Sequence, residues 1–204
     1  MKSQQLIGPG PRLPLHIIGS GGHGKVVADV ARACGYEPQF VEDGATIDGP
    51  IFVAIGDNVA RSKVSSNLKP ISLIHPSAIT SPSSTIGSGT IFMAGTIVQA
   101  ATAIGQGVIL NTGASVDHDC RIGDFVHISP GARLAGGVTV GERSWIGIGA
   151  VVREGVSIGK DVIVGAGAAV VNTVPDGATV VGVPAHAQVG KRPAKKGPAG
   201  PQEP

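Results

Sequence analysis

An aliphatic or aromatic residue returns every six positions from Ile86 to Val170 without interruption, and the fourth residue after each is small or β-branched. A helix repeats near 3.6 residues and a strand near two, so neither produces these two columns. A fixed six-residue period is typical of a parallel β-helix, in which each coil needs its neighbours to bury its inward residues. The six-residue series is Ile86, Phe92, Val98, Ile104, Leu110, Val116, Ile122, Ile128, Leu134, Val140, Ile146, Val152, Ile158, Val164 and Val170.

Glycine directly follows the repeated residue in seven of the fifteen hexads. A coil with frequent corners needs backbone angles that glycine adopts more easily than other residues. We therefore expect these glycines to supply the special angles of the corners. The seven are Gly87, Gly105, Gly123, Gly141, Gly147, Gly159 and Gly165.

The pattern resembles the left-handed β-helix of hexapeptide acyltransferases, in which three hexads make one triangular coil. The resemblance, and not the periodicity, implies the left hand, because parallel crossovers are usually right-handed. It also implies that residues eighteen apart stack on neighbouring coils.

Upstream of the repeats the sequence indicates a small α/β unit. Apolar strands at 15–18, 39–41 and 51–55 alternate with a helix over 25–33 that Gly35 ends, and a second short helix follows Gly56. This order is typical of a parallel sheet. We predict a Rossmann-like βαβ unit followed by a left-handed parallel β-helix. The ranges are a flexible arm at 1–13, the α/β domain at 14–72, the β-helix at 73–187 and a disordered tail at 188–204.

The charge and composition of the chain exclude some classes of binding partner. The net charge is +2, and the segment 188–204 holds four Lys or Arg against one Glu, so the rest is slightly acidic. No basic stripe interleaved with aromatic residues follows the repeats, which argues against nucleic acid. No apolar run of about 18 residues and no signal peptide are found, so we expect a cytoplasmic protein that does not enter a membrane. Of the two cysteines, Cys34 and Cys120, the second occupies an inward column and is expected to be a buried thiol.

The first predicted strand ends at a Gly-x-Gly-x-x-Gly motif over residues 19–24. Glycines let the backbone approach a pyrophosphate, and the following helix offers free N–H groups and its positive end. Glu42 and Asp43, about twenty residues on, can accept hydrogen bonds from ribose or sugar hydroxyls. A dinucleotide fold needs two halves, whereas this unit supplies one, so we expect one nucleotide. A tight turn without a ligand is the alternative, and His23 inside the loop argues against it.

His118 stands between two aspartates on the repeats. Acyl transfer from a thioester to an amine or hydroxyl needs a base with a pKa near neutral, and imidazole qualifies. A carboxylate on the other ring nitrogen would fix the tautomer, but the spacing leaves open whether Asp117 or Asp119 does so. Gly136, eighteen residues after His118, offers a backbone N–H to the thioester oxyanion.

Other interpretations apply to the same residues. Exposed repeat positions tolerate any polar residue, although three adjacent titratable groups on a charge-poor scaffold favour a function for His118. A zinc site needs three histidines, and the hexads from Ile86 to Pro175 hold only His118 and His127, so we expect no metal. Trp145, one coil after His127, either contacts a cofactor or fills a subunit interface.

Together these motifs resemble the bacterial sugar acetyltransferases, which include N-acetyltransferases of nucleotide-linked 4-amino-sugars and sialic acid O-acetyltransferases. The resemblance spans about residues 15–187. Besides the glycine loop, the motifs that carry it are Val53-Ala54-Ile55-Gly56-Asp57-Asn58, Leu73-Ile74-His75-Pro76-Ser77-Ala78, Ile109-Leu110-Asn111-Thr112, Asp117-His118-Asp119-Cys120 and Gly182-Val183-Pro184-Ala185.

The resemblance implies a role for individual residues. His118 would be the general base, Asp119 would raise its basicity, and Gly136 would supply the oxyanion N–H. The contacts to acetyl-CoA would be His127, Ile148 and Ala166. The contacts to the sugar nucleotide would be Gly21, Gly22, His23, Glu42, Asp43 and Gly56.

The predicted function is acetyl transfer from acetyl-CoA to the 4-amino group of a UDP- or GDP-linked deoxy-amino-sugar. The amine attacks directly, without a covalent enzyme intermediate, and the resemblance implies a homotrimer with acetyl-CoA between subunits. O-acetylation of a sialic acid or related sugar would use the same base and stays open. A non-enzymatic alternative is a nucleotide-sensing β-helix scaffold, which would neither bind acetyl-CoA nor release CoA.

Overall fold

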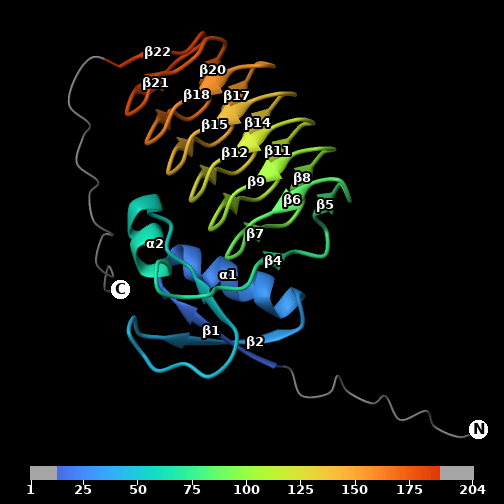
Figure 1. Cartoon of the computed structure of the whole chain (residues 1–204), viewed down its shortest axis with the longest axis vertical. Helices are drawn as coiled ribbons and strands as arrows, with labels where there is room; N and C mark the ends of the chain where they lie inside the picture. The colour runs from blue at the N-terminus through green and yellow to red at the C-terminus, as the bar shows by residue number, and fades with distance from the viewer. Residues whose placement is uncertain (1–12, 189–204) are drawn as a thin grey trace, which may run out of the picture.

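The computed structural model describes residues 13–188 (Figure 1). A small α/β unit at the N-terminal end is followed by a stack of coils that rises away from it toward the C-terminal end. The predicted flexible arm and disordered tail lie outside the described residues, apart from Leu13 and Gln188. No helix among residues 13–188 is long and apolar enough to cross a membrane.

The N-terminal unit is a three-stranded parallel sheet with two helices. Its elements are β1 (Leu13–Ile18), α1 (Gly22–Ala33), β2 (Tyr36–Val41), β3 (Ile51–Val53) and α2 (Asn58–Ser65). The strand order is β2-β1-β3. α1 begins three residues earlier than predicted, because the last three residues of the glycine motif, Gly22, His23 and Gly24, form the first helical turn after the N-cap Gly21. β2 also begins earlier, because Tyr36 pairs with Leu13 across the sheet.

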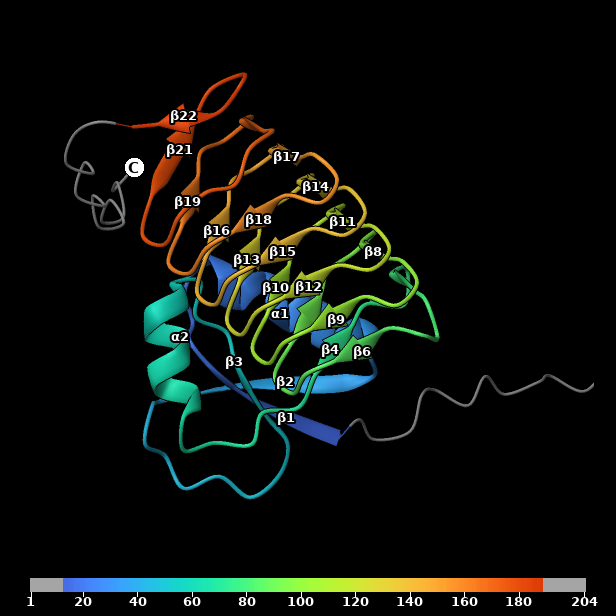
Figure 2. The same ribbon diagram turned by 45° about the horizontal axis from the view of Figure 1, so that its top comes forward.

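The coils form a left-handed parallel β-helix with three faces (Figure 2). The first face has eight strands: β4 (Leu73–Ile74), β7 (Ile91–Phe92), β10 (Ile109–Leu110), β13 (His127–Ile128), β16 (Trp145–Ile146), β19 (Ile163–Val164), β21 (Thr179–Val181) and β22 (His186–Ala187). The second face has six: β5 (Ile79–Thr80), β8 (Ile97–Val98), β11 (Ser115–Val116), β14 (Arg133–Leu134), β17 (Val151–Val152) and β20 (Ala169–Val170). The third face has five: β6 (Thr85–Ile86), β9 (Ala103–Ile104), β12 (Arg121–Ile122), β15 (Thr139–Val140) and β18 (Ser157–Ile158).

The predicted eighteen-residue register is confirmed. Leu110 pairs with Ile128, which pairs with Ile146, and all three side chains are fully buried. The second column is buried as well, and Ser144, one of its polar members, donates from its hydroxyl to the Gly159 carbonyl at 2.7 Å. The last coil is shorter, since Val180 follows its partner Val164 by sixteen residues. The repeated apolar residues therefore form the core of the stack.

The explanation predicted for the seven glycines is wrong. None of them has a positive φ, and the left-handed corner positions lie two residues further on, at Gly107 and Gly149 for example. The glycines after the apolar column lie against the backbone of the next coil instead. A Cβ on Gly141 would come within 2.5 Å of the Gly159 carbonyl carbon. Close approach of successive coils, rather than a special φ, therefore favours glycine at this column.

The N-terminal unit packs on the first face. Leu15 and Val27 share a buried cluster with Leu73, Ile91 and Ile109, the first residues of β4, β7 and β10. α2 lies along the corner between the third and first faces, as Figures 1 and 2 show. The corner between the second and third faces is on another side of the stack.

A buried arginine, Arg61, joins α2 to the corner between the third and first faces. Arg61 is 1% exposed and donates to the Gly107 and Phe125 carbonyls of the coils, both at 2.8 Å. It also donates to the Ile55 carbonyl at 2.9 Å and to the Asn58 side chain at 3.0 Å. Burial lowers the pKa of Arg61 to about 10, so the group stays a cation near neutral pH. Its hydrogen bonds replace the water that it loses on burial.

Candidate functional site

His118 lies on the turn that joins β11 to β12, at the corner between the second and third faces. Its ring Nδ1 lies 2.7 Å from Asp119 Oδ2. Asp117 Oδ1 instead accepts the backbone N–H of His118 at 2.8 Å. The structure thus decides which aspartate contacts the ring. Asp119 can reach it because this residue adopts a left-handed φ of 58°, which Asp tolerates better than most residues.

The contact with Asp119 affects both the pKa and the tautomer of the His118 imidazole. The hydrogen bond to the Asp119 carboxylate raises the pKa of His118, and the negative charge of Asp117 adds to this. A neutral ring donates its Nδ1–H to the carboxylate, which leaves Nε2 as the acceptor. The His118 side chain is 60% exposed, so a substrate can reach that nitrogen. This is the geometry of a general base whose second ring nitrogen is held by a carboxylate.

Gly136 lies directly against this ring, on the next coil. A Cβ on Gly136 would come within 2.6 Å of His118 Cε1 and 2.7 Å of Nε2. Among residues 13–188, the backbone N–H of Gly136 has no acceptor, whereas its neighbour Gly137 donates to the His118 carbonyl at 2.8 Å. The glycine therefore makes room for the imidazole and leaves a donor available beside it.

A second group of candidate residues lies on the first face. The His127 ring is stacked on Trp145, with centroids 5.8 Å apart and planes 6° apart. Asn111 Nδ2 lies 3.1 Å from His127 Nε2, which makes this ring nitrogen the acceptor of the pair. Trp145 donates to the Ser129 hydroxyl at 2.6 Å. The eighteen-residue register placed Trp145 correctly beside His127, and its role in binding stays a prediction.

His23 approaches the coils from the first turn of α1. Its ring centroid lies 6.4 Å from that of His127. Burial, with a smaller contribution from the positive Arg61, lowers the pKa of His23 to about 4, so the ring is neutral near pH 7. Its Nε2 is shielded from solvent and has no hydrogen-bond partner among the described residues. A neutral ring can donate to or accept from a ligand.

The other residues predicted to contact the nucleotide follow the strands of the N-terminal unit. Gly21 caps α1 without a side-chain hydrogen bond, and a Cβ on Gly21 or Gly22 would meet no atom within 4 Å. A Cβ on Gly56 would lie 3.9 Å from the His23 Cβ. The loop that begins with Glu42 and Asp43 follows β2 and is exposed. These residues share the carboxyl-terminal edge of the N-terminal sheet, where α/β folds bind their ligands.

Ile148 and Ala166 occupy equivalent turns at the corner between the first and second faces. Gly167 donates its backbone N–H to the Ile148 carbonyl at 2.8 Å, as expected for successive coils. The Ile148 side chain is 57% exposed, which is high for a large apolar residue. The pair forms part of an open surface that runs along the stack.

The predicted site residues therefore form two groups on different sides of one chain. His118, Asp119 and Gly136 lie together at the corner between the second and third faces. The residues predicted to hold acetyl-CoA and the nucleotide lie on the first face, at its corner with the second face, and in the N-terminal unit packed against it. Figure 2 shows this separation, because the turn between β11 and β12 lies on the side of the stack opposite α2. One chain alone does not bring the two groups together.

Some neighbours of these residues were missed from the sequence. Arg61 gave no signal, because an isolated cation on a short helix suggests only a solvated surface. Asn58 belongs to a motif that carries the family resemblance, but no role was predicted for it. Asn111 could have been found, since Ile109 pairs with His127 and Asn111 lies two residues further along that coil. No three His, Cys, Asp or Glu side chains within residues 13–188 are grouped so that they could hold a metal ion.

Known proteins match both parts of the chain. Residues 14–49 match the model of the PglD N-terminal domain, and residues 137–172 match that of the bacterial transferase hexapeptide. The acetyltransferase domain of PglB from Neisseria gonorrhoeae FA1090, in complex with acetyl coenzyme A, is 42% identical with a TM-score of 0.81 over 87% of this chain and 100% of its own. A variant of GDP-perosamine N-acetyl transferase from Caulobacter crescentus, in complex with CoA and GDP-perosamine, is 41% identical with a TM-score of 0.81 over 86% and 96%. WeeI from Acinetobacter baumannii AYE is 27% identical with a TM-score of 0.76 over 86% and 100%.

Proposed function

Because the chain belongs to the acetyl-CoA-dependent sugar N-acetyltransferases with hexapeptide repeats, we propose that it acetylates the 4-amino group of a nucleotide-linked deoxy-amino-sugar. The observation that carries the proposal is the contact of His118 with Asp119 beside the free N–H of Gly136. A base and an oxyanion donor on one exposed corner suit acyl transfer to an amine. The relative from Caulobacter crescentus, crystallised with CoA and GDP-perosamine, supports a sugar nucleotide as acceptor.

In the proposed reaction the neutral amine attacks the thioester carbonyl of acetyl-CoA directly. A C–N bond forms while the amine proton moves to Nε2 of His118. The tetrahedral oxyanion accepts the N–H of Gly136, and the C–S bond then breaks. The CoA thiolate takes the proton from the His118 imidazolium, so the base is regenerated and the products are an amide and CoA. No cysteine or serine is acylated.

We further propose that the enzyme is a homotrimer whose active sites lie between subunits. His127, Ile148 and Ala166 of one protomer would bind acetyl-CoA, and His118 of its partner would act on it. The separation of the two residue groups on different corners of one chain supports this arrangement. Since acetyl-CoA and sugar nucleotides are cytoplasmic metabolites, the proposed reaction takes place in the cytoplasm.

A mixed-trimer experiment tests the shared site. His118→Ala removes the base, and Ile148→Glu places a charge on the proposed acetyl-CoA surface without disturbing the core, because Ile148 is exposed. We expect each variant alone to be nearly inactive. Trimers reassembled from equal amounts of both should recover about a quarter of the sites, because only those sites combine two intact halves. Absence of recovery in verified mixed trimers would contradict a site between subunits.

The pH dependence of kcat/KM tests the role of Asp119. The base works deprotonated, so the rate falls as the pH drops through the pKa of His118, and Asp119 raises that pKa. We expect Asp119→Asn to move this limb to lower pH and to reduce the plateau, while Asn still tolerates the left-handed backbone. Asp117→Asn is the matched control and should shift the limb less. An unchanged limb in Asp119→Asn would exclude His118 as the group that titrates.

The stability of the product separates the proposed amide from an O-acetyl ester. The product of the enzymatic reaction is treated with alkaline hydroxylamine and its mass is measured again. We expect the added acetyl group to remain, because an amide resists hydroxylamine and an ester does not. Loss of the acetyl group would assign the transfer to a hydroxyl instead.

A further inference from the structure

Three backbone carbonyls on successive coils lie outside the hydrogen bonds that join the coils to one another. Gly107, Phe125 and Arg143 occupy equivalent turns at the corner between the third and first faces, with φ between 57° and 61°. Within residues 13–188, no backbone N–H donates to any of these three carbonyls. They are therefore available to donors from another element.

Two side chains of α2 supply those donors. Arg61 donates from Nε to the Gly107 carbonyl and from Nη2 to the Phe125 carbonyl, both at 2.8 Å. Asn58 donates from Nδ2 to the Arg143 carbonyl at 3.0 Å, and its Oδ1 accepts from Arg61 Nη2 at the same distance. Because residues three apart lie on one side of a helix, the pair joins α2 to three coils at once.

Arg61 also holds the loop that leads into α2. Its Nη1 donates to the Ile55 carbonyl at 2.9 Å and to the Gly56 carbonyl at 3.4 Å. A Cβ on Gly56 would lie 3.9 Å from the His23 Cβ, so this loop lies against the first turn of α1. One buried cation is therefore bonded both to the coils and to the backbone beside His23.

The position of the His23 ring depends on this packing. Its Nε2 is shielded from solvent and has no hydrogen-bond partner within residues 13–188, so no bond at that atom fixes the ring. The ring centroid nevertheless lies only 6.4 Å from that of His127 on the coils. The distance between the two rings is then set by how the N-terminal unit is held against the stack.

We infer that Arg61 sets the position of His23 relative to the coils and thereby acts as a positioning residue for the sugar nucleotide. The inference rests on the proposed function for the presence of that substrate beside His23. Arg61 is 1% exposed, so it acts through the loop and not by touching the substrate. A guanidinium suits this task, because its three nitrogens donate in one rigid plane, whereas lysine donates from a single nitrogen on a flexible chain.

Arg61→Lys tests the inference by steady-state kinetics. The variant keeps the cation but cannot keep the bonds to two coils and to the loop together. We expect kcat/KM for the nucleotide-linked 4-amino-sugar to fall about 10- to 100-fold, chiefly through KM, because a small displacement of a substrate contact is costly. The KM for acetyl-CoA should stay unchanged, because its proposed contacts all lie on the coils.

Arg32→Lys is the matched control. Arg32 lies on α1, and its side chain is 50% exposed and forms an ion pair with Asp29 at 2.9 Å. This substitution makes the same chemical change in the same unit without touching the coils-to-loop contact. Both KM values should therefore remain those of the unchanged protein.

Asn58→Ala provides a milder second variant with a readout that does not require activity. Burial, and to a smaller extent the charge of Arg61, lowers the pKa of His23 to about 4. Asn58→Ala keeps the arginine, so a rise in this pKa reports lost burial of the ring. We expect nuclear magnetic resonance titration of labelled histidines to show the rise in Asn58→Ala and in Arg61→Lys, but not in Arg32→Lys. Circular dichroism verifies that each variant is folded, and Asn58→Ala carries both measurements if Arg61→Lys does not fold.

The outcomes separate this inference from the proposed function. An unchanged KM for the sugar nucleotide in the folded variants, or an equal rise in the KM for acetyl-CoA, would overturn the positioning role. An unchanged pKa of His23 in both variants would overturn it as well. A raised pKa in a protein that transfers acetyl to no nucleotide-linked amine would leave the hold of Arg61 on His23 standing and contradict the reaction.

Discussion

His118→Ala should lower kcat by about 10²- to 10⁴-fold while leaving the fold intact. In the proposed mechanism this side chain removes the proton from the attacking amine, and the three atoms nearest to a Cβ on Gly136 all belong to its ring. The fold should persist because the imidazole is largely exposed and, among the described residues, forms a hydrogen bond only with Asp119. Steady-state kinetics with saturating acetyl-CoA measures the loss, and circular dichroism checks the fold.

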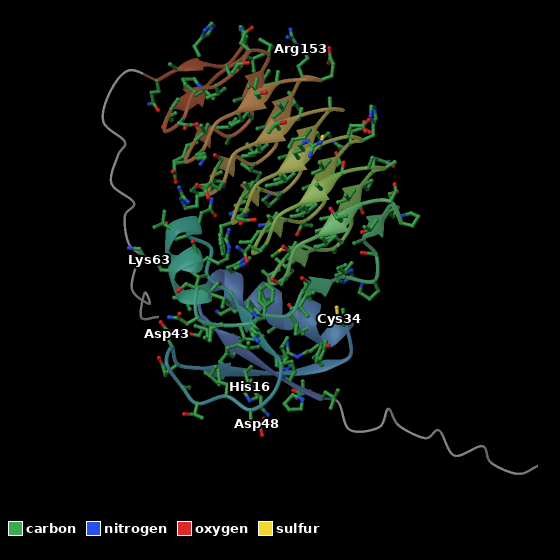
Figure 3. All side chains as sticks on the ribbon, in the orientation of Figure 1. His16, Cys34, Asp43, Asp48, Lys63 and Arg153 are labelled. Atoms are coloured by element: carbon green, nitrogen blue, oxygen red, sulfur yellow. The ribbon has the colours of Figure 1, made fainter. Side chains whose placement is uncertain are left out.

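His16→Ala is the matched control for this variant. His16 lies in β1, at the end of the N-terminal unit farthest from the coils, and its ring Nδ1 lies 3.3 Å from the Pro50 carbonyl (Figure 3). Its removal should change kcat little. A near-normal kcat for His118→Ala, beside a normal His16→Ala, would contradict the general-base mechanism.

Gly136→Ala should lower kcat by roughly 10²-fold, although it adds a single methyl group. The new Cβ would lie 2.6 Å from His118 Cε1, so the ring must move away from its position against this coil. The backbone N–H is retained, which means that the loss reports displacement of the base and not removal of the oxyanion donor. Exposure of the turn limits the effect on stability.

A double-mutant cycle shows whether the ring is the cause. In the His118→Ala background the added methyl has no imidazole to displace, so Gly136→Ala should cause little further loss. Independent, multiplicative losses in the double variant would mean that Gly136→Ala acts through the backbone or through substrate binding. Displacement of the His118 ring would then not be the cause of the loss in Gly136→Ala.

The stack of coils was predictable because the residues that form its buried core recur at a fixed six-residue spacing in the sequence. Leu110, Ile128 and Ile146 are buried for the same reason and recur at the same spacing, so one pattern fixes the whole core. The glycines were located correctly but explained wrongly. A six-residue period cannot distinguish a corner that needs a positive φ from a close approach such as that of Gly141 to Gly159, because the second depends on the distance between coils.

The sequence predicted the residue types of the site better than it predicted how those residues are arranged in space. Both aspartates beside His118 were candidates from the sequence, and only the left-handed φ of Asp119 brings one carboxylate to the ring. The buried position of Arg61 depends on carbonyls of the coils far along the chain, so nothing near it in the sequence predicts it. The placement of His118 and His127 on different sides follows from the corner that His118 occupies and the face that holds His127, which only the three-sided coil defines.

The most direct test of the proposed function is CoA release from acetyl-CoA, followed with a thiol reagent. The acceptors offered are GDP-, UDP- and dTDP-linked 4-amino-sugars together with free and CMP-linked sialic acid. We expect rapid release with a nucleotide-linked 4-amino-sugar and background release with sialic acid. Release with sialic acid alone, or silence across all acceptors by a folded protein, would contradict N-acetylation of a sugar nucleotide.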